Sequence, residues 1–220
     1  MENSLTQNKI FAKTFFWMFL GLLGSGLIAT YTYYSGLFEN LISNASFGVV
    51  LIVELVTVLL FNFLFRKLPP IAVGILYFVY SMVNGITLSV IFAVYELSSI
   101  IYIFIISALV FAILSFIGYM TNKDLSNWRA YITVFLIAGI ILSFVNLFFI
   151  KSSTLDLILD WFILAVFFGV TVYDINKIKL LQDEENINQE KIHIYCAMQL
   201  YLDFINIFIR ILSIFGKRRD

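Results

Sequence analysis

Long apolar runs separated by short polar breaks make up nearly the whole chain. A bilayer core about 30 Å thick needs roughly 20 apolar residues of helix to cross it, because each helical residue rises only about 1.5 Å. We find seven windows of about that length and predict a transmembrane helix in each. Their approximate bounds are residues 12–34, 47–65, 70–95, 98–120, 131–150, 155–173 and 194–215.

The apolar runs are continuous and lack the alternation of polar and apolar residues that membrane β-barrel strands show. Because only helices and closed barrels satisfy their backbone hydrogen bonds in lipid, the pattern predicts an all-α fold in one membrane domain over residues 1–220. The Pro69–Pro70 pair marks the start of the third helix. The first run follows Lys9 and Lys13 as in a signal peptide. It continues to Tyr34 without the usual small-residue cleavage site, so we interpret it as a retained helix.

Composition and charge exclude several classes of protein. The chain is 61% hydrophobic and 13% charged, whereas soluble domains carry roughly 25% charged residues. Lys plus Arg equals Asp plus Glu at 14 each, so no basic excess is available to neutralise a nucleic-acid backbone. Cys196 is the single cysteine and His193 the single histidine, which argues against an internal disulfide and a zinc site.

The distribution of basic residues predicts the orientation of the chain. Cytoplasmic loops retain Lys and Arg, and a cytoplasmic N-terminus leaves only Lys151 in the opposite loops. The basic tail Lys217–Arg219 would then lie outside after seven crossings. Either the upstream residues outweigh the tail, or the last helix enters the bundle without completing a crossing. The length and the lack of an organelle address point to a bacterial inner membrane. The basic residues placed inside are Lys9, Lys13, Arg66, Lys67, Lys123, Arg129, Lys177, Lys179 and Lys191.

A polar stripe runs along the last predicted helix. Gln199, Asp203, Asn206 and Arg210 follow one another at intervals of four, three and four, which places them on one helical face. Lipid would reject such a stripe, so this helix is expected to lie near the middle of the bundle. Asp203 is nine residues past Ile194, roughly 13 Å deep by helical rise. Either Asp203 serves a function, or it is a protonated acid packed against Asn206.

Further acids occur in other predicted helices. Asp174 is either a helix-end acid paired with Lys177 or Lys179, or a second intramembrane carboxyl group. Glu54 lies seven residues past Phe47, and we expect Arg210 to be its counter-charge. Asp156, Asp160, Thr171 and Asp174 share one face of the sixth helix, and interhelical hydrogen bonds are expected from Asn84, Thr87 and Ser89 in the third.

Four motifs identify a family resemblance that covers nearly the whole chain. They are NGITLS (Asn84–Ser89), GYMTNKDLSNW (Gly118–Trp128), YDINKIK (Tyr173–Lys179) and LYLDFINIFIRIL (Leu200–Leu212). The chain resembles the bacterial members of the Bax inhibitor 1 family, also called the transmembrane Bax inhibitor motif family. The resemblance implies six helices around a central seventh and a pH-sensitive calcium leak channel. Its sensor is an aspartate pair on the last two helices, which by motif is Asp174 and Asp203. Arg66 is the nearest candidate for the arginine that latches onto this pair in bacterial relatives, although its segment is longer here.

The resemblance and the acids together suggest a mechanism. Two adjacent carboxylates cannot both ionise cheaply in a poor dielectric, so the pair is expected to titrate as a unit. Deprotonation would favour a nearby cation, either an arginine or Ca²⁺, and the oxygens are too few for tight Ca²⁺ storage. We therefore expect a channel, not an enzyme, with no cofactor beyond the permeating Ca²⁺. Its expected partners are the lipid bilayer, Ca²⁺ and protons, with no nucleic acid and with protein partners left open. The candidate residues are Asp174 and Asp203 as pH sensor and transient Ca²⁺ ligands, Arg66 and Arg210 as latch or counter-charge, and Gln199, Asn206 and Glu54 along the ion path.

Other classes of function compete with this hypothesis. An intramembrane aspartyl protease would also use two aspartates, but the Gly-x-Gly-Asp motif of such proteases is missing before Asp203. A retinal protein needs a lysine in the last helix, and none lies between His193 and Gly216. A proton-coupled transporter and a non-transporting regulator of stress or cell death that acts through partners both stay open.

Overall fold

The computed structural model describes residues 2–44, 46–181 and 189–219, and these residues form helices and no strand. Seven helical stretches among them are long and apolar enough to cross a membrane. The predicted all-α fold with seven spans is therefore confirmed, whereas the arrangement of six helices around one stays a prediction. The spans are Lys9–Tyr34, Phe47–Leu64, Pro70–Val94, Leu97–Met120, Trp128–Ile150, Ser153–Lys179 and Glu190–Phe215.

The boundary error that bears most on the candidate site concerns the sixth helix, which was expected to end at Tyr173. Helix α8 (Ser153–Leu181) continues beyond this residue, because the polar side chains that follow it pack onto the end of a neighbouring helix. Asp174 therefore lies inside a membrane-spanning helix, not at its end. The last helix, α9 (Gln189–Phe215), is long enough to complete a crossing.

Two spans contain interruptions that the apolar pattern does not reveal. The third span consists of α4 (Pro70–Leu88) and α5 (Val90–Val94), and Ser89 between them donates its hydroxyl hydrogen to the carbonyl of Ile86 at 2.6 Å. In the fifth span, α7 (Trp128–Val145) continues as a π-helical turn, η1 (Asn146–Ile150). Such π turns have no simple sequence signal.

A buried asparagine shapes the turn between α7 and α8. The Asn146 amide donates to the Ser152 carbonyl at 3.0 Å and to an Asp156 carboxylate oxygen at 2.5 Å. The side-chain oxygen of Asn146 accepts a hydrogen bond from the Ser152 backbone N–H at 3.0 Å. Lys151, between them, has a φ of 54°, in the left-handed region. The Asn146 contacts hold this uncommon backbone conformation in place.

The described residues belong to two compact units, which we describe separately. Helix α9 contributes its first half to one unit and its second half to the other. Among the described residues, the first unit contains 2–44, 46–95, 181, 189–201 and 219, and the second contains Glu96–Leu180 and Leu202–Arg218.

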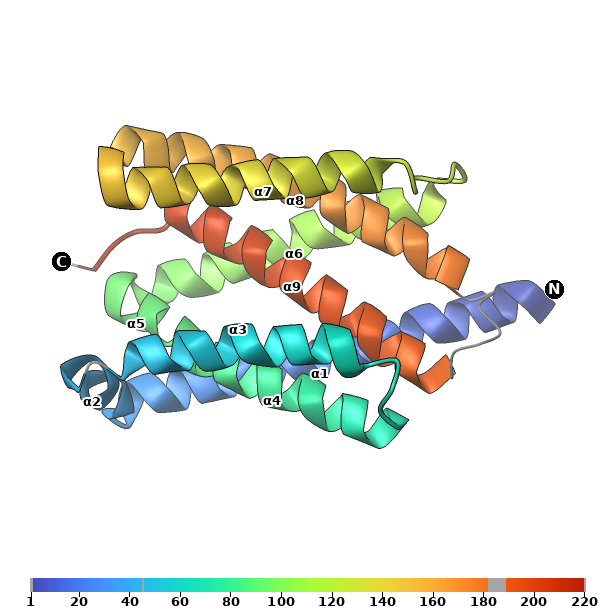
Figure 1. The fold of residues 1–220 in the computed structure, drawn as a ribbon, viewed down its shortest axis with the longest axis horizontal. Coiled ribbons are helices and arrows are strands. Elements are labelled where there is room, and N and C mark those ends of the chain that lie inside the picture. The colour runs from blue at the N-terminus through green and yellow to red at the C-terminus, as the bar shows by residue number, and fades with distance from the viewer. Residues whose placement is uncertain (1, 45, 182–188, 220) are drawn as a thin grey trace. The chain divides into compact units, whose positions relative to one another are not determined.

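In the first unit, α4 packs along both α1 (Glu2–Tyr34) and α3 (Phe47–Leu64), as Figure 1 shows. A Cβ at Gly85 would lie 2.6 Å from the Ser25 carbonyl oxygen, so α4 and α1 touch through backbone. Small residues permit this close approach in membranes, where lipid tails are as apolar as the side chains. The short helix α2 (Leu37–Ser43) lies in the polar break that was predicted between the first two spans.

In the second unit, α7 and α8 run side by side (Figure 1), and Gly139 of α7 faces Ile163 of α8. Helix α6 (Leu97–Met120) meets α8 at Gly118, where a Cβ would lie 2.7 Å from the Val172 carbonyl oxygen. The second half of α9 packs against α6 through Phe204, whose ring meets two α6 phenylalanines edge to face. The second unit is thus built from three complete helices and half of a fourth.

Candidate functional site

Two of the family motifs pack against each other in the second unit. The Asn176 amide donates to the Thr121 carbonyl at 2.9 Å, and its side-chain oxygen accepts from the Leu125 backbone N–H at 3.4 Å. The Lys179 ammonium donates to the carbonyls of Thr121, at 3.0 Å, and of Tyr119. The last carbonyls of a helix have no partner within it, so these contacts complete the end of α6. They also fix the part of α8 that carries Asp174.

The loop after α6 contains its own acidic turn. Asp124 accepts hydrogen bonds from the Ser126 backbone N–H at 2.8 Å and from the Ser126 hydroxyl at 2.5 Å. These bonds stabilise the charged carboxylate, so they lower the pKa of Asp124 below its ordinary value. Asp124 is exposed, and its role is to shape the loop that Asn176 holds.

The aspartate pair expected from the resemblance comes together inside the second unit. Asp174 on α8 and Asp203 on the second half of α9 lie close enough for the charge of one to act on the other. Asp203 is 3% exposed and Asp174 is half-buried. The Lys177 ammonium, three residues along α8, also lies within electrostatic range of Asp174.

Asp203 has an unusual environment for a buried carboxyl group. Its Oδ2 atom is buried and has no hydrogen-bond partner among the residues that the structure describes. The Asn206 amide, one turn further along, donates to the Leu202 carbonyl at 2.8 Å. Most buried polar atoms in proteins are paired, and the exceptions need an explanation.

An ion pair also connects α8 and α9. The Arg210 guanidinium meets the Asp160 carboxylate at 2.6 Å, and the Ser213 hydroxyl donates to the other Asp160 oxygen at 2.5 Å. Asp160 is buried, and Arg210 and Ser213 compensate its charge there. The sequence had placed Asp160 on the polar face of the sixth helix without a role. Ser213, one turn after Arg210, extends the predicted polar stripe.

The prediction that Arg210 is the counter-charge of Glu54 is wrong. In the first unit, Glu54 accepts hydrogen bonds from the Asn84 amide and the Thr87 hydroxyl, both at 2.6 Å, and from the Tyr80 hydroxyl at 3.4 Å. These donors are neutral and all come from α4. The expected interhelical hydrogen bonds of Asn84 and Thr87 are confirmed, whereas the Ser89 hydroxyl donates to the Ile86 carbonyl in the last turn of α4.

Tyr201 completes the Glu54 cluster in a way that the sequence did not indicate. Its hydroxyl donates to the Asn84 carbonyl oxygen at 2.7 Å, which orients the Asn84 amide group toward Glu54. Tyr201 is fully buried, and its ring packs edge to face on Tyr77 and Tyr80. A chain of hydrogen bonds therefore runs from α9 through α4 to α3 within the first unit.

The remaining predicted residues are placed as follows. Arg66 is exposed just beyond α3, with its guanidinium 5.7 Å from the centre of the Phe65 ring and its carbonyl accepting from the Lys191 ammonium at 3.1 Å. Its latch role stays a prediction. Gln199 is half-buried in the first half of α9. No group of three or more His, Cys, Asp or Glu side chains that could hold a metal ion occurs within the described ranges.

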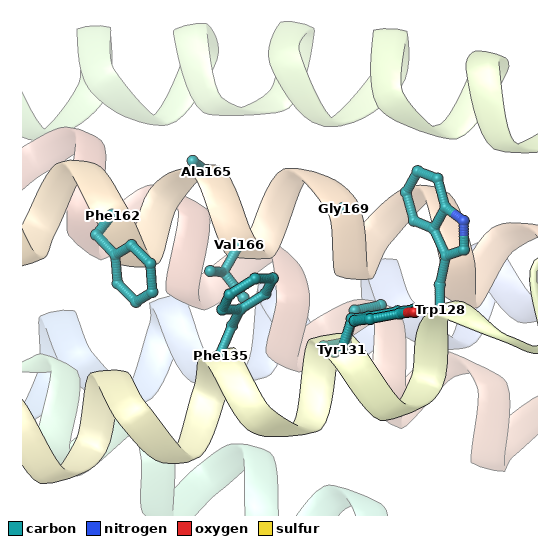
Figure 2. A pocket seen from close by; sticks show the side chains of 8 residues that line it. Trp128, Tyr131, Phe135, Phe162, Ala165, Val166 and Gly169 are labelled. Carbon is teal, nitrogen blue, oxygen red and sulfur yellow. The ribbon is translucent and has the colours of Figure 1, made fainter.

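Two cavities in the second unit differ in chemistry. One, of about 450 Å³, lies between α7 and α8 and is lined by aromatic and aliphatic residues such as Trp128, Phe135 and Phe162 (Figure 2). It contains no charged side chain, so it is a poor site for ion chemistry. The other, of about 310 Å³, is bounded by α7, α8 and α9 and is lined in part by Ser143, Asn206 and Arg210. The polar stripe of α9 therefore borders a cavity.

The fold and these buried acids define a polytopic helical membrane protein with ionisable groups inside its spans. The family model described as "Inhibitor of apoptosis-promoting Bax1" matches residues 7–220. The chain therefore belongs to the Bax inhibitor family, as its motifs predicted.

Bacterial relatives resemble the chain over nearly its full length. It is 36% identical over 214 residues to the inner membrane protein YbhL of Escherichia coli K12. The match covers 94% of this chain and 91% of that protein. It is 34% identical over 225 residues to a protein of Borreliella burgdorferi, covering 100% and 96%. A membrane protein of Streptococcus pyogenes serotype M1 is 33% identical over 223 residues, covering 96% of both chains. The Escherichia coli and Streptococcus pyogenes relatives are named as membrane proteins.

Proposed function

We propose that this protein is a pH-sensitive leak pathway for Ca²⁺ in a bacterial inner membrane, with the pair Asp174 and Asp203 as its sensor. The observation that carries the proposal is the proximity of these two carboxyl groups on α8 and α9. With one proton between them, the pair would carry a single negative charge and could share a hydrogen bond. Without it, two negative charges repel each other inside a membrane span and attract a cation.

The free oxygen of Asp203 supports a role in ion passage. A buried carboxylate that serves only stability would be expected to have its oxygens paired, as those of Asp160 and Glu54 are. Asp203 Oδ2 has no such partner among the described residues and is available to a proton or a cation. Hard divalent cations prefer oxygen ligands, and two carboxylates bind more weakly than the six to eight oxygens of a storage site. Passage of Ca²⁺ is therefore favoured over storage.

The surroundings of the pair supply further parts of a path. Asn206 is one turn beyond Asp203 and lines the cavity of about 310 Å³ together with Arg210. Arg210 is held by Asp160, so its positive charge is partly neutralised there. We expect this ion pair to limit the passage of cations along the polar stripe. We also propose that Gln199 contributes to the path, that Arg66 serves as the latch, and that the N-terminus is cytoplasmic, whereas the paired oxygens of Glu54 favour a structural role for that acid.

The test is a Ca²⁺ flux measurement on purified protein in liposomes that contain a calcium indicator, over a series from about pH 6 to pH 8. The rate of the wild-type protein should change across this range. Asp174→Asn and Asp203→Asn should each remove most of the pH response, because neither variant retains a pair that can share one proton. Glu39→Gln, which changes an exposed acid on α2, is the matched control and should behave as wild type.

The same experiment separates the competing functions. A pH response that survives in both Asn variants would contradict the proposed sensor. No flux from a correctly folded protein at any pH would favour a regulator that acts through partners. Counterflow of a solute across the same liposomes, with a proton movement in fixed ratio, would instead identify a proton-coupled transporter.

A further inference from the structure

A large pocket in the first unit is separate from the acids discussed above. Its volume is about 640 Å³, and it is formed by the beginnings of three spans, on α1, α4 and the first half of α9. Trp17, Gly74 and Phe78 form part of its apolar wall. Lys13, His193 and Glu190 line the same pocket, so it combines an apolar surface with charged groups.

The charged groups lie together at one level of the membrane. Lys13 and Glu190 are both within electrostatic range of His193. Glu190 is the first residue of its span, and Lys13 is four residues into its own span, roughly 6 Å by helical rise. Phe78 lies eight residues into the span that begins at Pro70, roughly 12 Å deep. The pocket therefore runs from charged residues at headgroup depth to aromatic residues at acyl-chain depth.

His193 gives a second indication that a ligand binds here. The residue is only 4% exposed, yet its Nδ1 atom has no hydrogen-bond partner among the described residues. An imidazole that lines a pocket and has no partner for its Nδ1 atom among the described residues can offer that nitrogen to a bound group. Lys13 is exposed at the same place and supplies three N–H donors.

We propose that this pocket binds one molecule of phosphatidylethanolamine. The lipid phosphate would accept hydrogen bonds from Lys13 and His193, and the primary ammonium of the headgroup would approach Glu190. One acyl chain would lie against Trp17, Gly74 and Phe78. A purely anionic headgroup would bring a negative charge to the Glu190 carboxylate and no ammonium to bind it, and a choline headgroup has no N–H to donate. The charges of the pocket thus match a zwitterionic headgroup that has a primary amine.

The chain contains its own probes for this proposal. Trp17 lines the proposed lipid pocket, whereas Trp128 lines the uncharged pocket between α7 and α8 shown in Figure 2. Replacing the other two tryptophans by Phe gives Trp128→Phe/Trp161→Phe, with Trp17 as the only indole, and Trp17→Phe/Trp161→Phe, with Trp128 as the only indole. Brominated acyl chains quench a tryptophan that they touch, so each variant reports on one pocket.

The experiment compares brominated phosphatidylethanolamine with brominated phosphatidylcholine in vesicles of otherwise constant phosphatidylcholine content. At Trp17 we expect a relative binding constant about two- to fivefold higher for phosphatidylethanolamine, the range that corresponds to one partly exposed ion pair. At Trp128 the two lipids should quench equally. The preference at Trp17 should disappear in Glu190→Gln, because the ammonium loses its partner.

Two further variants separate a specific site from a general effect of charge. Lys13→Gln should weaken quenching of Trp17 by both lipids, whereas Lys9→Gln, one turn earlier on α1 and outside the pocket lining, should leave it unchanged. Equal quenching of Trp17 by the two lipids in the otherwise unmodified chain would overturn the proposal. Stronger quenching by brominated phosphatidylglycerol than by phosphatidylethanolamine would also overturn it, since the site would then select an anionic lipid.

Discussion

The two units contain buried acids in opposite environments. In the first unit, Glu54 accepts hydrogen bonds from three neutral side chains of α4, so both of its oxygens are paired. In the second unit, Asp203 has an oxygen without a partner among the described residues, and Asp174 lies within range of its charge. A carboxyl group in a membrane span is expensive in both places, but only the second arrangement leaves it free to exchange a proton or bind a cation.

The second unit also offers a comparison within itself. Asp160 is paired with Arg210 and Ser213, whereas Asp203, on the same helix as Arg210, has no partner for its Oδ2 atom in the described part of the chain. Breaking a buried ion pair by removing one partner leaves an uncompensated charge. Substitutions that remove a partner of Asp160 or Glu54 should therefore lower the free energy of unfolding more than the substitution of Asp203 itself.

The largest effect on stability is expected from Arg210→Met. Asp160 would keep only its hydrogen bond from Ser213, and the free energy of unfolding in mixed micelles should fall by about 3 kcal/mol. The side chain of Arg210 is 30% exposed, which favours the lower end of the range for buried pairs. The double variant Asp160→Asn/Arg210→Met should recover most of the loss. If the single and double variants unfold alike, the ion pair is not what stabilises this part of the unit.

A smaller loss is expected from Asn84→Ala in the first unit. This change removes a donor to Glu54 and the acceptor of Tyr201, so it should lower the free energy of unfolding by about 1.5 kcal/mol or somewhat more. Asn62→Ala is the matched control, because the Asn62 amide donates only to the Val58 carbonyl of its own helix, at 2.9 Å, and its side chain is exposed. Similar losses in both variants would argue against a special role for the Glu54 cluster.

Backbone packing near Asp174 should respond to Gly118→Ala. The new methyl group would lie 2.7 Å from the Val172 carbonyl oxygen and 2.8 Å from Ile175 Cβ, so α6 and α8 must separate. Overpacking of this kind costs about 1 to 3 kcal/mol, measured by the same unfolding titration. Gly169→Ala on α8, where a Cβ would meet nothing within 4 Å, should be neutral or slightly stabilising. A neutral Gly118→Ala would contradict the close α6–α8 contact.

The smallest effect is expected from Asp203→Asn. Because Oδ2 has no partner to lose among the described residues, the free energy of unfolding should change by less than about 0.5 kcal/mol or increase slightly. The same variant should lose the pH response of Ca²⁺ flux, so its stability and its function should separate. A loss of stability as large as that of Arg210→Met would mean that Asp203 is a structural acid.

The sequence predicted the membrane spans well because their length is set by the bilayer, a property that each segment carries locally. The bounds of the third span, expected at residues 70–95, are Pro70–Val94 in the structure. Polar side chains misled the prediction at the end of α8. Asn176 and Lys179 were interpreted as a loop, but they bond to the end of α6, and a single segment does not reveal that contact.

The partners of the buried acids were the hardest features to predict. Rarity of unpaired charge in lipid suggested that Glu54 needs a partner, but it does not say whether that partner is charged. The spacing of Asn84 and Thr87, three residues apart on one helical face, was the available signal for a shared acceptor. The pair Asp174 and Asp203 came from the family motifs, and no periodicity of the chain predicts that two such helices place their acids together.

The most direct test of the sensor is infrared spectroscopy of the protein in lipid, followed through the carbonyl stretch of protonated carboxylic acids during a pH titration. The wild-type protein should show a band that appears and disappears as one proton is gained and lost, and this band should be missing or shifted in both Asp174→Asn and Asp203→Asn. Glu39→Gln should leave it unchanged. A titrating band that persists in Asp203→Asn, or its absence from the wild-type protein at every pH, would contradict a proton shared between these two helices.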